Sequence, residues 1–352
     1  MAAEGSREVG GSLPVPNVQE VASLNPKDIP HRYIRPTLSV DFSVDQSLQI
    51  PVLDLTRLCS DHPSQELAKL HQACKEWGFF QLINHGAAQV IEEMKTATEE
   101  FFKLPLSEKM KSGQQPNNIE GYGQAFVVSE DQKLDWGDML FLMSLPVPLR
   151  NMQFWPQNPP NFRATIDKYS KEVQKIAMMV VSLMETNLGI EAQKLRRAFE
   201  DCNQGIRMNY YPPCTQAEKV MGLTAHSDAT GLTLLLQLNQ VQGLQINIHG
   251  KWVPIQPLAD AIVVNIGDIM EIMSNGEYRS IEHRAVVNTT KERLSIAAFH
   301  SPNMDTSIGP LSDLTKTTCE KYKRLTHKEY VTLVVNTKLD GKTLLDQLKL
   351  TH

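Results

Sequence analysis

The chain of 352 residues has few cysteines, no long apolar run and no excess of basic residues. Its five cysteines are an odd number without a C-x-x-C pair, which disfavours a disulfide framework and a thiolate zinc site and fits a reducing compartment. No run of about eighteen apolar residues occurs, so we expect no membrane-spanning helix. Lysine and arginine total 35 against 40 acidic residues, so we expect no non-specific binding to nucleic acid.

Targeting signals and several catalytic motifs are absent as well. The first residues, MAAEGSREVGG, lack the apolar segment of a secretory signal, and the last residues, KLTH, match no retention or peroxisomal signal. We therefore expect a cytoplasmic protein, and a monomer because no coiled-coil heptad or long exposed apolar strand is evident. Without a Walker loop, a nucleophile elbow or a dinucleotide fingerprint, NTPase, hydrolase and dehydrogenase functions have no support.

The chain divides into four regions that differ in composition and in the spacing of apolar residues. Residues 1–48 are rich in glycine, serine and proline and predict an extended lead-in with a short helix near 18–23. Residues 49–200 mix strand-like runs with helical spacing, strongest over 90–102 and 166–188, where Gly189 ends the pattern. Residues 201–302 predict a β-rich core, and residues 303–352 a carboxy-terminal helical segment.

Eight short strand-like runs follow one another in the β-rich core, with turn residues between most of them. The expected strands are 206–211, 221–226, 231–238, 243–248, 252–257, 261–266, 278–287 and 293–300. This spacing is typical of a sandwich, a barrel or a jelly roll. We expect an α+β protein with a mainly β core, flanking helices and a mixed amino-terminal region.

An ionisable pair stands at the head of one apolar run, in T-A-H-S-D-A-T-G-L-T-L-L-L-Q. Residues two apart on a strand share a face, so His226 and Asp228 can share a ligand. A buried carboxylate needs a partner or a metal. By themselves the two residues are also compatible with a hydrogen-bonded pair on a sheet surface.

Two further segments favour a metal centre. The stretch S-I-E-H-R-A-V-V-N-T-T-K-E-R-L-S-I-A-A-F predicts a hairpin with His283 on one arm and with Arg293 and Ser295 on one face of the other. An arginine among apolar residues needs a counter-charge, and its planar fork suits a carboxylate. In R-M-N-Y-Y-P-P-C, Asn209 and Tyr211 form another same-face pair, and the Tyr211 phenol can reach the same carboxylate.

Two histidines and a carboxylate that leave coordination positions open are the facial triad of non-haem Fe(II) oxygenases. Zinc is the competing metal, because such a site also serves hydrolases. The set formed by Arg293, Ser295 and Tyr211 favours iron with an organic acid as co-substrate, since zinc hydrolysis does not need it.

Taken together, these motifs resemble the plant 2-oxoglutarate/Fe(II)-dependent dioxygenases. The resemblance rests on H-x-D, the later histidine, R-x-S and N-Y-Y-P-P-C, together with I-P-V-L-D-L and A-C-K-E-W-G-F-F-Q-L-I-N-H-G, and spans roughly residues 14–345. The segments R-M-N-Y-Y-P-P-C, E-G-Y-G-Q-A-F and S-E-D-Q-K-L-D-W look most like the S-norcoclaurine-synthase-like, senescence-related and alkaloid O-demethylase branch. A strigolactone-pathway oxidoreductase branch shares much of this pattern.

The resemblance implies a double-stranded β-helix, or jelly roll, with the site in its mouth. His226, Asp228 and His283 match the Fe(II) ligands. Arg293 and Ser295 match the clamp on the distal carboxylate of 2-oxoglutarate, Tyr211 its phenol partner, and Asn209 a residue near the metal-binding end of the co-substrate. O2 is the oxidant, ascorbate the expected reductant, and succinate and CO2 the expected products. Because halogenating relatives lack the carboxylate ligand, Asp228 predicts hydroxylation-type chemistry.

The substrate is expected to be a small ring-containing plant metabolite: an alkaloid, a flavonoid-like phenolic or a hormone. The positions expected at its pocket are Phe299, Ser227, Ser301, Phe126 and Arg207. Phe299 and Phe126 are equally compatible with core aromatics, and Arg207 with either an acidic substrate or a surface salt bridge. Two alternatives stay open: a non-catalytic binding protein on the same fold, and an ascorbate-using relative of the ethylene-forming oxidase.

Overall fold

The structure of the chain is a computed structural model. It describes residues 12–24, 28–35, 48–116, 118–124, 127, 129–335 and 341–351. Of the residues predicted to line the substrate pocket, Phe126 lies outside the described residues. Among the residues that the structure describes, no helix combines the length and the apolar character that a membrane span requires.

A large sheet of eight strands forms the centre of the molecule. Its strands, in spatial order, are β1 (Val52–Asp54), β2 (Phe79–Ile83), β10 (Ile262–Ile266), β7 (Leu232–Gln237), β12 (Arg293–Ser301), β5 (Asn203–Tyr211), β4 (Asp138–Leu145) and β3 (Gly121–Gly123). All neighbours are antiparallel except β1 and β2. The central strands of this sheet come from the β-rich core, and strands of the amino-terminal region are added at both of its edges.

A smaller antiparallel sheet faces the large one. It contains β6 (Leu223–His226), β11 (His283–Ala285), β8 (Leu244–Ile248) and β9 (Lys251–Pro254), in that order. Phe79 and Val263 of the large sheet pack with Leu244, Ile246 and Val253 of the small one in a single apolar cluster. All eight strands predicted between residues 206 and 300 are present, and the predicted jelly-roll fold is confirmed. The predicted hairpin is wrong, because β11 pairs with β6 and β8 in the small sheet, whereas β12 pairs with β5 and β7 in the large one.

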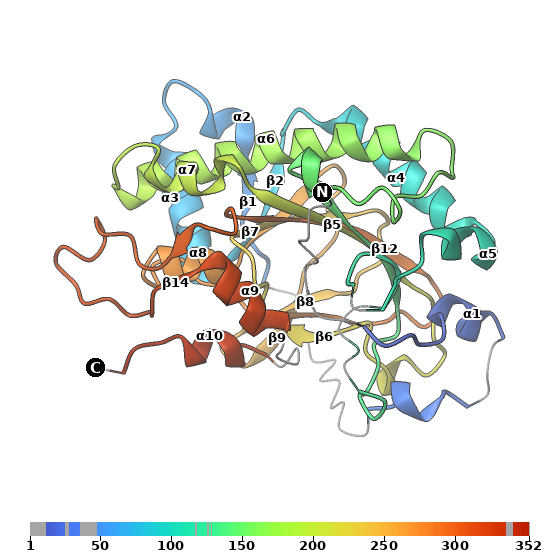
Figure 1. Ribbon diagram of the computed structural model, residues 1–352. Coiled ribbons are helices and arrows are strands. Elements are labelled where there is room, and N and C mark those ends of the chain that lie inside the picture. Colours follow the sequence, from blue (N-terminus) through green and yellow to red (C-terminus); the bar gives the residue numbers. More distant parts are fainter. Residues whose placement is uncertain are drawn as a thin grey trace, which may run out of the picture.

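A layer of helices covers the outer face of the large sheet (Figure 1). It comprises α3 (Ser64–Gln72), the π-helical turn η2 (Ala73–Trp77), α4 (Ala88–Lys103), α6 (Phe162–Leu188) and α7 (Lys194–Glu200). The buried stripe of α6 includes Ile166, Val173 and Val180, and packs against β4, β5, β7 and β12. The helix predicted over 166–188 is confirmed, and Gly189 ends it with a left-handed φ of 61°.

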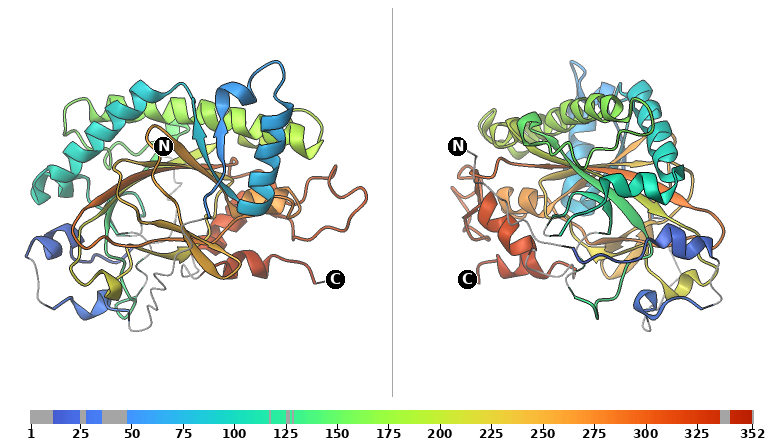
Figure 2. Two further views of the ribbon diagram at one scale, coloured as in Figure 1. Left: turned by 180° about the vertical axis from the view of Figure 1, so that it is seen from behind. Right: turned by 45° about the vertical axis from the view of Figure 1, so that its right-hand side comes forward.

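Shorter elements complete the described fold. The helical ones are α1 (Val18–Ser23), η1 (His31–Tyr33), α2 (Leu55–Leu58), α5 (Leu106–Lys109), η3 (Met110–Ser112), η4 (Val147–Leu149), η5 (Ala217–Lys219), α8 (Asp268–Met273), α9 (His327–Val335) and α10 (Thr343–Gln347). β13 (Ser307–Ile308) pairs antiparallel with β14 (Leu325–Thr326). In both views of Figure 2, α1 lies at the opposite end of the sheets from α9 and α10.

The sequence patterns did not predict β3, β4 or α8. The β4 segment D-M-L-F-L-M-S-L has no period-two alternation, because both of its faces are largely buried. Its conformation comes from pairing with β5 over almost its whole length. Tertiary pairing therefore decides this strand, since its leucines and methionines suit a helix equally well.

Candidate active site

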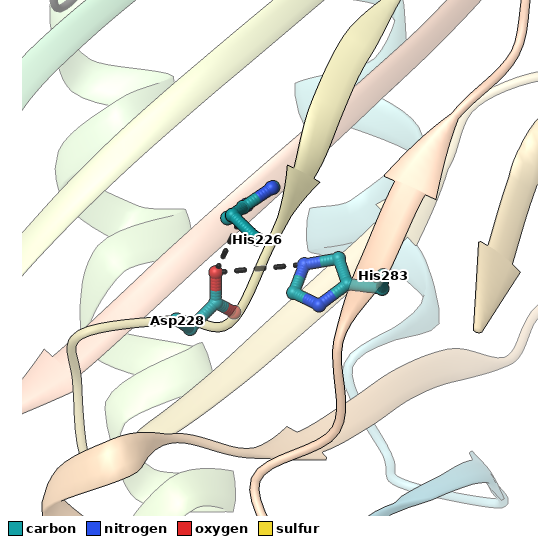
Figure 3. A group of neighbouring side chains, drawn as sticks. All are labelled: His226, Asp228 and His283. Atoms are coloured by element: carbon teal, nitrogen blue, oxygen red, sulfur yellow. Dashed lines mark ion pairs between the residues drawn. The ribbon is translucent and has the colours of Figure 1, made fainter. Parts of the chain in front are cut away.

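Three side chains from the small sheet and the loop that follows it converge on one point (Figure 3). The ligand atoms of His226, Asp228 and His283 all lie within 4.8 Å of one another. The Nε2 atom of each histidine is 3.5 Å from Oδ1 of Asp228. All three side chains are buried, so the group has the donor set, the spacing and the shielding of a metal centre.

Strand pairing brings the two histidines together. His226 ends β6 and stands directly opposite His283, which begins β11, so their ring centroids are 4.4 Å apart. Asp228 lies beyond the end of β6, in the turn that leads to β7. The turn, rather than regular strand alternation, therefore aims this carboxylate at the histidines.

Hydrogen bonds fix the atom that each of these side chains presents. Nδ1 of His226 lies 2.7 Å from the carbonyl oxygen of Thr224, and Nδ1 of His283 lies 3.1 Å from that of Ile281. A nitrogen that donates to a carbonyl carries the proton, which leaves Nε2 of each ring free to bind a metal.

The two carboxylate oxygens of Asp228 also have separate partners. Its Oδ2 accepts hydrogen bonds from Thr233 Oγ1 at 2.6 Å and from Asn265 Nδ2 at 2.8 Å, while Oδ1 faces the histidines. No sequence motif indicates Thr233 or Asn265. A signal for Asn265 existed, because it is the one polar residue in the buried strand I-V-V-N-I and so needs a partner.

Burial alone would raise the pKa of Asp228, but His283, His226 and Asn265 outweigh this effect and hold it well below its usual range. Burial lowers the pKa of His283 to about 4. Burial also acts to lower the pKa of His226, yet its bond to Asp228 prevails and raises it. The group therefore carries an ionised carboxylate and a neutral His283 at neutral pH, as metal binding requires.

A second group of polar side chains lies on the inner face of the large sheet. In the register of β5 and β12, Arg293 stands opposite Tyr211, and Ser295 opposite Asn209. Nδ2 of Asn209 donates to Ser295 Oγ at 3.4 Å, and the guanidinium carbon of Arg293 is 5.4 Å from the centre of the Tyr211 ring. The strand pairing thus brings together all four residues predicted to hold the co-substrate.

The Arg293 guanidinium is buried and lacks a counter-charge among the described residues. Its Nε has no hydrogen-bond partner, and a terminal nitrogen donates to Gln237 Oε1 at 3.4 Å; its other polar neighbour is the uncharged Tyr211 phenol. Burial lowers the pKa of Arg293, although a guanidinium stays protonated in proteins. Oδ1 of Asn209 is buried and unpartnered as well. These atoms fit an acidic ligand that the protein chain does not itself supply.

One cavity joins the two groups. Its wall includes the three metal-site residues, the four residues on β5 and β12, and also Phe79, Arg207 and Phe299. Of the predicted substrate residues, Phe299 and Arg207 therefore lie at the cavity. Ser227 and Ser301 are not among its lining residues: Ser227 instead donates to Asp268 Oδ2 at 3.1 Å, and Ser301 ends β12 opposite Asn203.

A second cavity of about 310 Å³ adjoins the first. The two share Arg207, Asn209 and Tyr211, and the second is also lined by residues of the segments 131–135 and 137–139 and by Arg35 of the lead-in. Its volume lies at the small end of the range typical of ligand sites. The sequence patterns did not identify Arg35 or the 131–135 segment as parts of a site.

Two family models match the chain. The model described as the 2OG-Fe(II) oxygenase superfamily matches residues 202–302, and that described as the non-haem dioxygenase in morphine synthesis N-terminal matches residues 50–158. The first match contains the metal-site residues and the four residues on β5 and β12. The second covers most of the strands and helices that precede β4.

Similar proteins cover nearly the whole chain. S-norcoclaurine synthase 1 of Coptis japonica is 55% identical, over 97% of this chain and 98% of that protein. Codeine O-demethylase of Papaver somniferum is 46% identical, over 97% of this chain and 98% of that protein. The crystal structure of JOX2 in complex with 2OG, Fe and JA has a TM-score of 0.87 and 36% identity, over 96% of this chain and 99% of that one.

Proposed function

Because the chain belongs to the plant 2OG-Fe(II) oxygenase family, we propose that it hydroxylates or oxidatively O-demethylates a small ring-containing metabolite. The comparisons confirm the predicted family, enzyme class and cofactors. The protein is an Fe(II)- and 2-oxoglutarate-dependent dioxygenase. The finer proposal depends on one observation. The metal-site residues and an acid-binding group face one cavity that also presents an aromatic ring, Phe299.

His226, Asp228 and His283 would hold Fe(II), with Nε2, Oδ1 and Nε2 as the donor atoms. Three protein ligands leave coordination positions for a co-substrate and dioxygen. Thr224, Ile281, Thr233 and Asn265 hold the ligand side chains in place through the hydrogen bonds described above. Outer partners of this kind raise metal affinity because the ligands need not reorient on binding.

Arg293 and Ser295 would bind the distal carboxylate of 2-oxoglutarate, with Tyr211 beside them and Asn209 nearer the metal. Burial of Arg293 makes this charge-assisted contact strong and keeps water from competing for it. The Tyr211 ring has a fixed place, since added Cβ atoms at Gly137 and Gly222 would lie within 2.8 and 3.0 Å of it. Those two glycines form a slot for the ring.

Fe(II) and 2-oxoglutarate, when bound together with O2, would supply the chemistry that oxidises a substrate C–H bond, one oxygen atom going to the substrate and the other to succinate as CO2 is released. The protein decides which C–H bond lies nearest the metal. Phe299 lies farther along β12 than Ser295 and can stack on a substrate ring. Arg207, on β5, stands opposite Ala297, which lies between Ser295 and Phe299 on β12. If the oxidised carbon is an O-methyl group, the hydroxylated product collapses to an alcohol or phenol and formaldehyde.

Codeine O-demethylase, one of the relatives described above, supports the demethylation branch of the proposal. The alternative of an ascorbate-using relative is not supported, because the family and the solved relative give 2-oxoglutarate as the co-substrate. The expected cytoplasmic location, monomeric state and use of ascorbate as reductant stay predictions.

The test is mass spectrometry of a panel of methoxylated alkaloids, flavonoids and hormone-like acids incubated with the enzyme, Fe(II), ascorbate and 2-oxoglutarate. We expect one compound to gain an oxygen or to lose a methylene, with stoichiometric succinate. His226→Ala serves as the metal-site control, and His85→Ala as a matched histidine control, because His85 bonds to the Asp260 carbonyl away from the cavity.

Product in the His85→Ala enzyme and none in the His226→Ala enzyme would support the proposal. If no compound changed and succinate stayed at the His226→Ala level, the proposed oxidation would be refuted.

A further inference from the structure

We propose that the cavity beside the metal centre binds an acidic group of the substrate, with Arg207 as the main anchor and Arg35 as a second donor. The inference rests on the proposed function, because it names the substrate class for that same site. It follows from charges and unpartnered donors in the wall of the cavity.

Arg207 is placed to contact a substrate rather than the co-substrate. It shares the inner face of β5 with Asn209 and Tyr211, and it lines both the metal cavity and the adjoining cavity. Two residues along a strand span roughly 7 Å. An acid bound at Arg207 therefore lies beside the clamp around Arg293, on the side toward Phe299.

The Arg207 guanidinium lacks a partner in the described part of the chain. Its Nε is buried without a hydrogen bond, and none of the ion pairs found between described residues includes it. A half-buried guanidinium donor without an acceptor is unfavourable, whereas a carboxylate accepts from it with good geometry. The missing acceptor is therefore best supplied by a ligand.

The other charged groups of this cavity are the cations Arg35 and Lys133 and the carboxylates Asp131, Asp135 and Asp138. Most of these groups already have an ion-pair or hydrogen-bond partner in the protein. Asp135 pairs with Arg35 at 2.7 Å, and Asp138 accepts the backbone N–H groups of Val18 and Gln19, each at 2.8 Å.

Lys133 donates to the His31 carbonyl oxygen, and Asp131 lies at the exposed rim. The inner wall consequently presents an uncompensated positive charge at Arg207. On the inner wall, an ammonium group of a substrate would meet this charge without a free carboxylate beside it, since Asp131 lies at the rim. The electrostatics favour acids over amines.

Arg35 brings the lead-in into the same site. One terminal nitrogen of its guanidinium contacts both Asp135 and Thr224 at 2.7 Å, whereas its Nε is buried and has no hydrogen-bond partner; Arg35 lines the second cavity. Thr224 is the residue whose carbonyl oxygen holds Nδ1 of His226. Thr224 therefore contacts both Arg35, through its hydroxyl group, and a histidine of the metal centre, through its carbonyl oxygen.

The test compares three compounds with one ring and different charge: para-methoxycinnamic acid, its methyl ester and para-methoxycinnamylamine. Binding is measured anaerobically by calorimetry on the Fe(II) enzyme with saturating 2-oxoglutarate, so that the Arg293 clamp is already filled. We expect the acid to bind at least about ten-fold more tightly than the ester or the amine, the scale of one charge-assisted hydrogen bond.

Three variants locate the effect. Arg207→Gln should remove the preference for the acid, Arg207→Lys should restore much of it by keeping the charge, and Arg35→Gln should weaken it. Arg57→Gln, at a side chain that is 73% exposed, should bind like the unmodified enzyme. Thermal unfolding of each variant identifies any that fail to fold. If Arg207→Gln fails to fold, the acid preference of Arg207→Lys tests the role of the charge.

Equal binding of acid and ester, tightest binding of the amine, no measurable acid binding, or a preference that survives Arg207→Gln would each overturn the inference. So would a raised KM for 2-oxoglutarate in Arg207→Gln with the acid preference unchanged, because Arg207 would then serve the co-substrate. If the acid preference holds but no compound of the mass-spectrometry panel gives product, the proposed oxidation alone is refuted.

Discussion

The hydrogen bond from Thr233 to Asp228 offers a direct test of how the metal centre is built. Thr233→Val keeps the size and the β-branching of this residue in β7 and removes only the hydroxyl group. The lost bond is 2.6 Å long and ends on an ionised carboxylate, so it belongs to the strong class of hydrogen bonds. Asn265 would remain as the partner of Oδ2.

Loss of such an outer partner typically weakens metal binding by about ten- to a hundred-fold, or ~1.4–2.8 kcal/mol. We expect that loss for Fe(II), because Asp228 can then rotate and must be reordered on binding. The assay is anaerobic titration of the metal-free protein with Fe(II) in competition with a chromophoric chelator. The melting temperature of the metal-free protein should fall by no more than a few degrees.

Thr98→Val is the matched control. Thr98 is fully buried in α4, and its hydroxyl has no hydrogen-bond partner, so its removal should leave Fe(II) affinity unchanged. An affinity change of less than about three-fold in Thr233→Val, or an equal change in Thr98→Val, would refute the reasoning that the hydroxyl positions the carboxylate.

Other changes test the co-substrate group and a buried carboxylate. Arg293→Lys should raise the KM for 2-oxoglutarate about ten- to a hundred-fold, because an ammonium cannot form the forked contact, and an unchanged KM in steady-state assays would contradict this. Gly243→Ala should raise the same KM without changing Fe(II) affinity, since its Cβ would lie 2.6 Å from Cδ of Arg293; equal effects on both would contradict it. Burial raises the pKa of Asp138 from 3.8 to about 6, so the folded state binds this proton more tightly than the unfolded state. Stability from this group therefore falls as pH rises from about 4 to about 6, by about 3 kcal/mol, and Asp138→Asn should flatten that part of the curve of unfolding free energy against pH.

The sequence predicted the β-rich core because its signals are local. Each of the eight runs between residues 206 and 300 has strand character and is followed by turn residues, and each appears in the structure as β5 to β12. The metal-binding candidates were also found locally, since His226, Asp228 and His283 are ionisable residues in apolar surroundings. Resemblance to a family then supplied their expected roles.

Some features of the site do not follow from local pattern. The pairing of His226 with His283 depends on the register between β6 and β11, and a shift of one residue would turn the rings to opposite faces. Thr233 and Asn265 support Asp228 from β7 and β10, which belong to the other sheet. β4 becomes a strand because β5 pairs with it.

By itself, the sequence determined which residues can bind a metal and an acid and which runs can form strands, because side-chain chemistry and period-two patterns are properties of short segments. The tertiary structure decided that Ser227 turns to Asp268, that Phe299 and Arg207 line the metal cavity, and that Arg35 of the lead-in lines the adjoining cavity together with Arg207. These outcomes depend on how distant segments pack, and the free energy of that packing belongs to the assembled sheets rather than to any one stretch of chain.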